Sequence, residues 1–294
     1  MTEPRSAGKR FREALKNHSP LQIVGTPNAL SAIMAKKVGF KALYLSGGAL
    51  SAFTYGLPDL GILTLENFLT EVNRITEAVD TPLLVDIDTG FGSAFNIERT
   101  IKLMIKAGAA AVHIEDQISA KRCGHRPKKE LVSTQEMADR IHVAVASKTD
   151  PSFFIIARTD AVSVEGLEKA LARAKAYEAA GADAIFAEAC GNLEEYKAFV
   201  HTLRIPVLAN ITEFGSTPLF TLQELESAGV KMALYPFAAT RMMNQAALIT
   251  YETILKKGTQ KDLIGSMQTR EAMYDFLHYH DYENRLDRLL KEMK

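Results

Sequence analysis

Short apolar segments recur along the whole chain, separated by longer stretches with a helical pattern of apolar positions. Most are rich in Val, Ile, Leu or Phe, and each is too short for a helix. This is typical of strands that are buried on both faces, as in parallel sheets. We predict eight such strands, at 22–25, 42–47, 82–88, 110–116, 153–160, 184–189, 206–210 and 232–236.

The stretches between these segments carry helix signals. Residues 65–79 place one set of apolar side chains on a single helical face: Leu65, Phe68, Leu69, Val72, Ile75 and Val79. Ser133 with Glu136, and Thr221 with Glu224, have the spacing of capping boxes at helix starts. We therefore expect helices to alternate with the strands.

Prolines and glycines precede the predicted strands in alternation. The residues in question are Pro20, Pro82, Pro151 and Pro206 before one set, and Gly39, Gly108, Gly181 and Gly229 before the other. Each glycine is placed to end a helix and lead into a strand. This weak internal repeat favours an α/β fold of the (β/α)8 TIM-barrel type. The alternative is a doubly wound open sheet, which usually has fewer strands and a Gly-rich phosphate turn, and the sequence has no GxGxxG.

The chain length suits one barrel with an extension better than two domains. Barrels of this type commonly use 200–250 residues, and the chain has 294. We expect the barrel at 1–258 and a helical extension at 259–294, packed on the barrel or on a partner subunit. The extension carries a group of aromatic side chains, Tyr274, Phe276, Tyr279 and Tyr282.

Composition narrows the class of partner. Lys and Arg together number 35, as do Asp and Glu, so the formal net charge is zero and offers no general attraction to nucleic acid. No run of 18 apolar residues predicts a membrane span, and the charged start does not resemble a signal peptide. Two cysteines are too few for a disulfide framework. We expect a cytoplasmic globular protein that acts on a small molecule.

Acidic side chains gather at the predicted carboxyl ends of two neighbouring strands. Asp86 and Asp88 stand two residues apart, so both are expected on one face while Ile87 points away. With Glu115 at the next strand end they supply hard oxygen ligands, which favours Mg²⁺ or Mn²⁺ over Zn²⁺. Asp59 could hold a water of the metal. The alternative is a D-x-D turn whose carboxylates only cap the backbone.

The segment 117–133 is a long basic loop after the fourth strand, and we expect it to act as a lid over a polyanionic substrate. Cys123 lies between Arg122 and His125, and these neighbouring cations are expected to favour its thiolate. The alternative is an ordinary solvated loop. Cys190 has no such setting and is expected to be structural. His113 lies among apolar residues and is expected to be a core histidine.

Two further strand ends carry groups suited to carboxylates. Arg158 can bind a carboxylate through two N–H groups, and Asn210 and Thr212 add neutral donors. This collection fits a substrate with two or three carboxylates, without identifying it.

Seven segments in chain order now resemble a known family: YLSGG (44–48), GLPDLG (56–61), DIDTGFG (86–92), HIEDQ (113–117), KRCGHRP (121–127), ARTDA (157–161) and ANITEFG (209–215). They are similar to the 2-methylisocitrate lyases, within the isocitrate lyase and phosphoenolpyruvate mutase superfamily. The resemblance covers nearly the whole chain, and K-[KR]-C-G-H is specific to the lyase branch. Ile87 departs from the family, which often has Ala there.

The resemblance implies a (β/α)8 barrel whose last helix is exchanged between subunits, usually in a homotetramer. It implies Mg²⁺ at Asp86 and Asp88, with Asp59 and Glu115 near the waters of the metal. The implied contacts to a tricarboxylate substrate are Ser46, Gly47, Gly48, Arg122, Gly124, His125, Arg158, Glu188, Asn210, Ile211, Thr212, Arg241 and Arg270.

The implied reaction is retro-aldol cleavage of 2-methylisocitrate to pyruvate and succinate, a step of propionate catabolism by the methylcitrate cycle. Arg158 is expected to stabilise negative charge on the succinate half, and Cys123 to deliver a proton to it. Tyr44, a metal-bound water and a carboxylate are candidates for the base. The alternatives are cleavage of isocitrate, the activity of a phosphonate- or oxaloacetate-processing relative, and a non-catalytic barrel.

Overall fold

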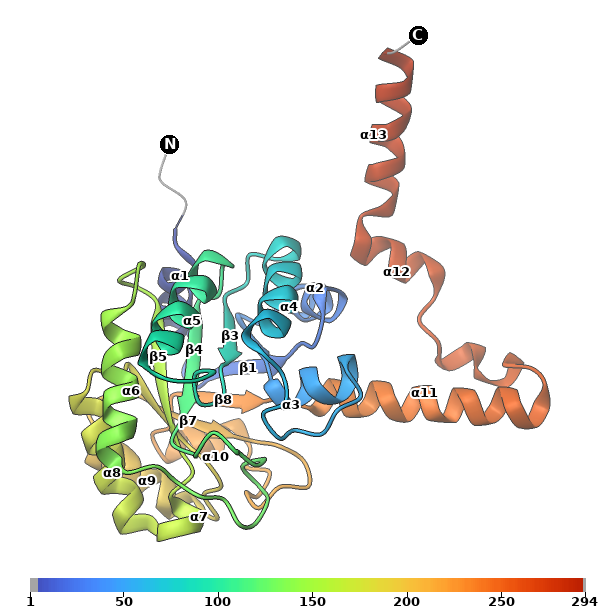
Figure 1. Cartoon of the computed structure of the whole chain (residues 1–294). Helices are drawn as coiled ribbons and strands as arrows, with labels where there is room; N and C mark the ends of the chain where they lie inside the picture. The colour runs from blue at the N-terminus through green and yellow to red at the C-terminus, as the bar shows by residue number, and fades with distance from the viewer. Residues whose placement is uncertain (1–4, 293–294) are drawn as a thin grey trace. The chain divides into compact units, whose positions relative to one another are not determined.

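The eight predicted strands close into a parallel barrel in the computed structural model, which describes residues 5–292 (Figure 1). Each strand pairs with the next along the chain, and the eighth pairs with the first. The prediction of a barrel is confirmed, and the open-sheet alternative is wrong. The strands are β1 Leu21–Gly25, β2 Ala42–Leu45, β3 Leu83–Asp86, β4 Ala111–Glu115, β5 Phe154–Thr159, β6 Ala184–Ala187, β7 Val207–Asn210 and β8 Met232–Tyr235.

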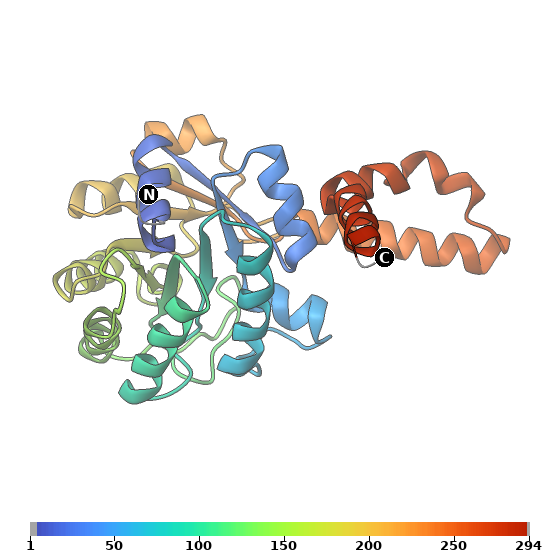
Figure 2. The same cartoon turned by 90° about the horizontal axis from the view of Figure 1, so that it is seen from above.

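Helices alternate with the strands and surround them (Figures 1 and 2). Up to the eighth strand they are α1 Ala7–Asn17, α2 Ala29–Val38, α3 Gly47–Ala49 with the π-turn η1 Leu50–Thr54, α4 Leu65–Ala78, α5 Ala94–Lys106, α6 Thr134–Ala146, α7 Val162–Glu165, α8 Leu167–Ala179, α9 Leu193–Thr202 and α10 Leu222–Ser227. After it come α11 Ala238–Lys257, the 3₁₀ turn η2 Lys261–Ser266, α12 Arg270–Leu277 and α13 Tyr279–Glu292.

Local sequence signals set the helix boundaries. Gly39 ends α2 with φ 114°, a left-handed conformation that favours glycine. Thr221 and Glu224 form the expected capping box of α10. The box predicted at Ser133 is only half made, because Ser133 accepts the Glu136 N–H while the Glu136 carboxylate pairs with Arg140 instead.

Side chains of the strands alternate between two apolar layers. One set, including Val85, Ile87 and Ile155, packs between the strands and the surrounding helices. The other set fills the inside of the barrel, and α1 adds Phe11 to it. The ring of Phe11 lies 5.1 Å from that of Phe154, and α1 lies across one end of the barrel (Figure 2). That end is therefore closed by packing, which leaves the other end for the polar residues.

Contacts divide the chain into a unit that ends at Thr240 and a unit from Arg241 onward. The boundary that we expected after residue 258 lies just beyond the end of α11, whereas this division falls in the first turn of that helix. Within residues 5–292, no helix is long and apolar enough to cross a membrane. The second unit has many exposed apolar side chains, among them Leu255, Tyr282, Leu286 and Leu290. Packing of this part on a partner stays a prediction.

We predict that Phe11→Ala lowers the free energy of unfolding by about 3–5 kcal/mol, because it leaves a cavity in the interior of the barrel. Phe11 has no exposed surface, whereas Phe95 on α5 is 83% exposed and serves as the control. Phe95→Ala is expected to change stability by less than about 0.5 kcal/mol. Equilibrium denaturation in urea measures both, and equal effects of the two substitutions would contradict this account of the core.

Candidate active site

Charged side chains are buried at the carboxyl ends of the strands, where the sequence predicted a site. We call one set of them the rim: the carboxylates Asp86, Asp88, Glu115, Asp160 and Glu188, and the cations Lys121, Lys129 and Arg158. Strand register brings several together, since Glu115 on β4 pairs with Arg158 on β5 and Asp86 on β3 pairs with His113 on β4. Lys121 and Lys129 come from the loop 117–133, which we call the lid.

Asp86 and Asp88 meet the backbone at Gly47. The Gly47 N–H donates to Asp86 Oδ2 at 3.1 Å, and a Cβ at Gly47 would lie 3.0 Å from that oxygen and 3.2 Å from Asp88 Oδ1. The lack of a side chain at Gly47 therefore lets both carboxylates approach. The strand itself ends at Asp86, and Asp88 has a left-handed φ of 48°. Our expectation that both lie on one strand is wrong, although Ile87 does point away into the outer layer.

Lys121 joins the lid to the carboxylates of Asp88 and Asp59. Its Nζ lies 2.5 Å from Asp88 Oδ1 and 2.9 Å from Asp59 Oδ1, so the ammonium stands between the two carboxylates. Burial alone would lower the pKa of Lys121, but the surrounding carboxylates raise it well above its usual value. Lys121 therefore stays charged. The sequence placed it in the basic lid without a specific partner.

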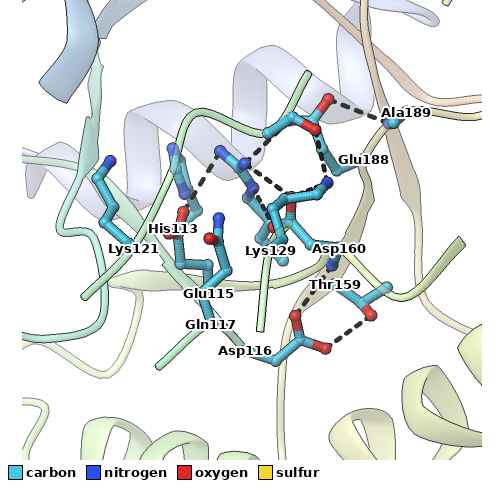
Figure 3. Close-up of polar contacts among 12 residues, drawn as sticks. His113, Glu115, Asp116, Gln117, Lys121, Lys129, Thr159, Asp160, Glu188 and Ala189 are labelled. Atoms are coloured by element: carbon cyan, nitrogen blue, oxygen red, sulfur yellow. Dashed lines mark hydrogen bonds and ion pairs between the residues drawn. The ribbon is translucent and has the colours of Figure 1, made fainter. Parts of the chain in front are cut away.

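Arg158 is the cation at the centre of the rim, and its guanidinium pairs with Glu115, Asp160 and Glu188, the three carboxylates labelled in Figure 3. Its Nε donates to Asp160 Oδ2 at 2.9 Å, while Nη1 lies 3.4 Å from Glu115 Oε2 and Nη2 lies 3.3 Å from Glu188 Oε2. Its Cζ is 5.1 Å from the centre of the Phe186 ring. Burial would raise the pKa of Asp160 and Glu188, but Arg158 together with the other neighbouring cations and hydrogen bonds lowers the pKa of both. These two carboxylates are therefore ionised.

Glu188 joins the lid to β7. His125 Nδ1 accepts the Ser216 N–H at 3.2 Å, so we assign the hydrogen to Nε2, which lies 3.0 Å from Glu188 Oε1. Asn210 Nδ2 donates to both oxygens of Glu188 at 3.3 Å. Glu188 is thus hydrogen-bonded both to His125 of the lid and to Asn210 at the end of β7.

The rim has more acidic than basic groups. Its five buried carboxyl groups face three buried cations, so the acidic groups outnumber the cations by two. Burial raises the pKa of Glu115 well above its usual value and that of Asp88 to about 6, in spite of the nearby cations. Neither oxygen of Glu115 has a hydrogen bond. Acidic groups whose pKa is raised by burial and by each other are suited to binding a divalent cation, because the cation neutralises them in place of a proton.

The same residues do not enclose a cation by themselves. In residues 5–292, no three His, Cys, Asp or Glu side chains form a group that could hold a metal ion. Mg²⁺ does not require such a group, because it usually keeps several waters and binds one or two carboxylates together with substrate oxygens. The residues present therefore fit a magnesium ion held by the Asp86 and Asp88 pair.

Tyr44 and His113 form a buried pair beneath Asp86. The Tyr44 hydroxyl and His113 Nε2 are 2.8 Å apart, and that nitrogen lies 3.6 Å from Asp86 Oδ1. Burial lowers the pKa of His113 to about 4, so the ring is neutral. Burial and the charge of Asp86 raise the pKa of Tyr44 well above its usual value. Tyr44 therefore keeps its proton, which disfavours it as the base.

Cys123 is partly buried in the lid, and its electrostatics differ from our expectation. Burial raises the pKa of the thiol, and this effect outweighs the neighbouring cations. The expected thiolate is therefore wrong, and the group is a thiol that carries a proton. Gly124 beside it packs on the rim so closely that a Cβ there would lie 2.3 Å from Arg158 Nη2. Cys190 is fully buried, as expected of a structural residue.

The family model described as phosphoenolpyruvate phosphomutase matches residues 11–255. The 2-methylisocitrate lyase of Escherichia coli (strain K12) is 57% identical over 285 residues, covering 97% of this chain and 96% of that protein. The 2-methylisocitrate lyase of Aeropyrum pernix is 43% identical over 278 residues, covering 95% and 89%. The chain belongs to the 2-methylisocitrate lyase family.

Solved structures of the superfamily share the fold of this 2-methylisocitrate lyase family member. A 2,3-dimethylmalate lyase has a TM-score of 0.89 at 32% identity, covering 98% of this chain and 96% of that one. A phosphonopyruvate hydrolase in complex with oxalate and Mg²⁺ has a TM-score of 0.86 at 28% identity, covering 97% and 100%. The barrel is thus common to enzymes with different substrates, so the fold alone does not identify the substrate of this chain.

The predicted site residues of the 2-methylisocitrate lyase family fall into two groups in this structure. Those brought to the rim or next to it are Tyr44, Gly47, Gly48, Asp59, Asp86, Asp88, Glu115, Gly124, His125, Arg158, Glu188 and Asn210. Ser46 is next to this group as well, because its side chain forms a hydrogen bond with Tyr44. Of the others, Ile211 and Thr212 are buried at strand ends, the Arg122 side chain is exposed, and Arg241 and Arg270 belong to the second unit.

Sequence reasoning missed four groups at this site. His113 alternates with Glu115 along β4, and this period of two placed both on the inner face. Lys121 and Lys129 were seen only as part of a basic run. Asp160 follows Arg158 by two residues, so the same alternation could have identified it as the partner of that guanidinium.

We predict that Cys123 reacts with iodoacetamide slowly at pH 7, and that its rate rises with a midpoint above the usual thiol value of about 8.5. Its raised pKa means that less thiolate is present at a given pH than in an exposed cysteine. Mass spectrometry of the labelled peptide measures the rate, and buried Cys190 serves as the unreactive reference. A midpoint below about 8 would show that the neighbouring cations lower the pKa of the Cys123 thiol more than burial raises it, and it would contradict this prediction.

Proposed function

We infer that this chain cleaves 2-methylisocitrate to pyruvate and succinate. The observation that carries this inference is the seating of the lid, which places Gly124 directly on Arg158 and Glu188 with Cys123 beside it. A proton-bearing thiol is thereby held next to an arginine suited to a carboxylate. Relatives 43–57% identical over nearly the full chain are 2-methylisocitrate lyases. A carbon–carbon lyase is the activity that agrees with both.

Arg158 and Asn210 supply the hydrogen-bond donors for the half of the substrate that becomes succinate. Cleavage of the C–C bond leaves negative charge on this half, and donors fixed before the reaction stabilise such charge most strongly in a site shielded from water. Arg158 is fixed by Asp160, while Asn210 is fixed by Glu188. The rim carboxylates thus keep the donors in place, although they carry the same charge as the substrate.

Asp86 and Asp88 are the residues that would hold Mg²⁺, with Asp59 and Glu115 nearby. The ion, when bound, supplies positive charge that polarises the hydroxyl and carboxylate oxygens of the substrate. Mn²⁺ has similar preferences and is expected to substitute for it.

Cys123 is the proton donor in this account. Its raised pKa keeps the thiol protonated before the cleavage step, which a general acid requires. The base that takes the hydroxyl proton is better sought among the rim carboxylates than at Tyr44, whose phenol is held in its protonated form.

We propose further that the chain forms a homo-oligomer, a tetramer by family resemblance, in which the last helices are exchanged between subunits. In support, residues 241–292 carry exposed apolar side chains on both α11 and α13, such as Leu255 at 87% and Tyr282 at 70%. The predicted contacts of Arg241 and Arg270 with the substrate also remain proposals. A cytoplasmic location stays a prediction.

We predict that pyruvate forms from 2-methylisocitrate with Mg²⁺ and that EDTA abolishes the reaction. Glyoxylate formation from isocitrate is the matched control, since the two substrates differ by one methyl group. One methyl group in an apolar pocket is worth ~1–3 kcal/mol, so kcat/KM is expected to favour 2-methylisocitrate by at least about tenfold. Equal kcat/KM values, or full activity in EDTA, would contradict the proposed function.

A further inference from the structure

Lys129 is a buried lysine that none of the roles above uses. It lies near the carboxyl end of the lid, and its side chain is only 2% exposed. Its Nζ donates to the carbonyl oxygen of Gly124 at 2.5 Å and to Asp160 Oδ1 at 2.7 Å (Figure 3). A lysine is rarely buried in this way unless it is paired, so the two contacts account for its position.

The ends of the lid are fastened by other means. Gln117 and Leu131 form an antiparallel bridge, and the Ile118 N–H donates to the Glu130 carbonyl at 3.0 Å. The Gln117 side chain holds both the N–H and the carbonyl of Arg122, each at 2.9 Å. These contacts fix the base of the loop and its path up to residue 122. They do not reach the Cys123–Gly124 segment.

Two side chains of the lid hold that segment to the barrel. His125 contacts Glu188, as described above, and Lys129 binds the Gly124 carbonyl from within the lid. The Lys129 bond differs because its cation is balanced by Asp160, the carboxylate that also orients Arg158. Asp160 therefore orients Arg158 directly and, through Lys129, also positions the lid backbone next to Cys123.

We propose that Lys129 is a positioning residue, which fixes Cys123 over the substrate by joining the Gly124 carbonyl to Asp160. The proposal rests on the proposed function, because it takes Cys123 as the proton donor. A charged donor gives a stronger and shorter hydrogen bond than a neutral one, and it is buried here away from competing water. Loss of Lys129 should disturb proton delivery by Cys123 more than substrate binding, since the substrate-binding groups of the barrel remain.

The test compares Lys129→Met with Lys128→Met in the full chain with Mg²⁺. Both remove one positive charge from the lid, but Lys128 is exposed and contacts neither Gly124 nor Asp160. For Lys129→Met we expect kcat to fall roughly 10- to 100-fold while KM changes less than about threefold, because a misplaced proton donor slows the chemical step. Lys128→Met should keep the wild-type values.

Hydrogen exchange gives a readout that does not depend on activity. The Arg126 N–H donates to the Cys123 carbonyl at 2.9 Å and reports the order of this part of the lid. Mass spectrometry of a peptide that spans residues 122–128 should show faster exchange in Lys129→Met and unchanged exchange in Lys128→Met. If Lys129→Met does not fold, Lys129→Gln keeps a donor of similar length without the charge and should lower kcat about tenfold at similar KM.

Wild-type kcat and wild-type exchange in a folded Lys129 variant would overturn the proposal. A rise in KM with unchanged kcat would also overturn it, because Lys129 would then contact the substrate rather than position the lid. Failure of the proposed function is distinguishable, since wild-type protein would then form no pyruvate from 2-methylisocitrate. The exchange comparison would still decide whether Lys129 orders the lid.

Discussion

The Arg158 guanidinium is the buried cation on which the active end of the barrel depends. It lies within 3.4 Å of carboxylate oxygens of Glu115, Asp160 and Glu188, and Phe186 supports it from below. Removing one partner from a buried ionic cluster leaves charges without compensation, which is strongly destabilising. The position of Arg158 is therefore determined from several sides, and so is the position of each carboxylate around it.

Even with Arg158 in place, the rim has more acidic than basic groups. This excess explains why the lid buries lysine side chains at this end of the barrel. The lid brings two lysines into the barrel end, Lys121 against Asp59 and Asp88, and Lys129 against Asp160. The position of the lid on the rim is thus favoured by charge as well as by packing at Gly124. A divalent cation and a polyanionic substrate would also change the total charge at the rim. The ion adds positive charge beside Asp86, and the substrate adds negative charge beside Arg158.

Much of this was predictable from sequence because it depends on local patterns. Eight apolar segments of strand length predicted the barrel, and the polar residues at their carboxyl ends placed Asp86, Glu115 and Arg158 at one end of it. The roles of Lys121 and Lys129 were not predictable, because the path of a long loop decides which of its many basic side chains becomes buried. The thiol state of Cys123 was predicted with the wrong sign, since adjacent residue types indicate charge but not the depth of burial.

The most direct test of the charge balance at the rim is the location of Mn²⁺ by anomalous diffraction from crystals of the full chain grown with MnCl₂. The account predicts one anomalous peak at the rim, within about 2.0–2.3 Å of a carboxylate oxygen of Asp86 or Asp88 or of a water bound to them. No peak at the rim at saturating Mn²⁺, or a peak bound only by residues outside it, would contradict the claim that these buried carboxylates form the site of a divalent cation.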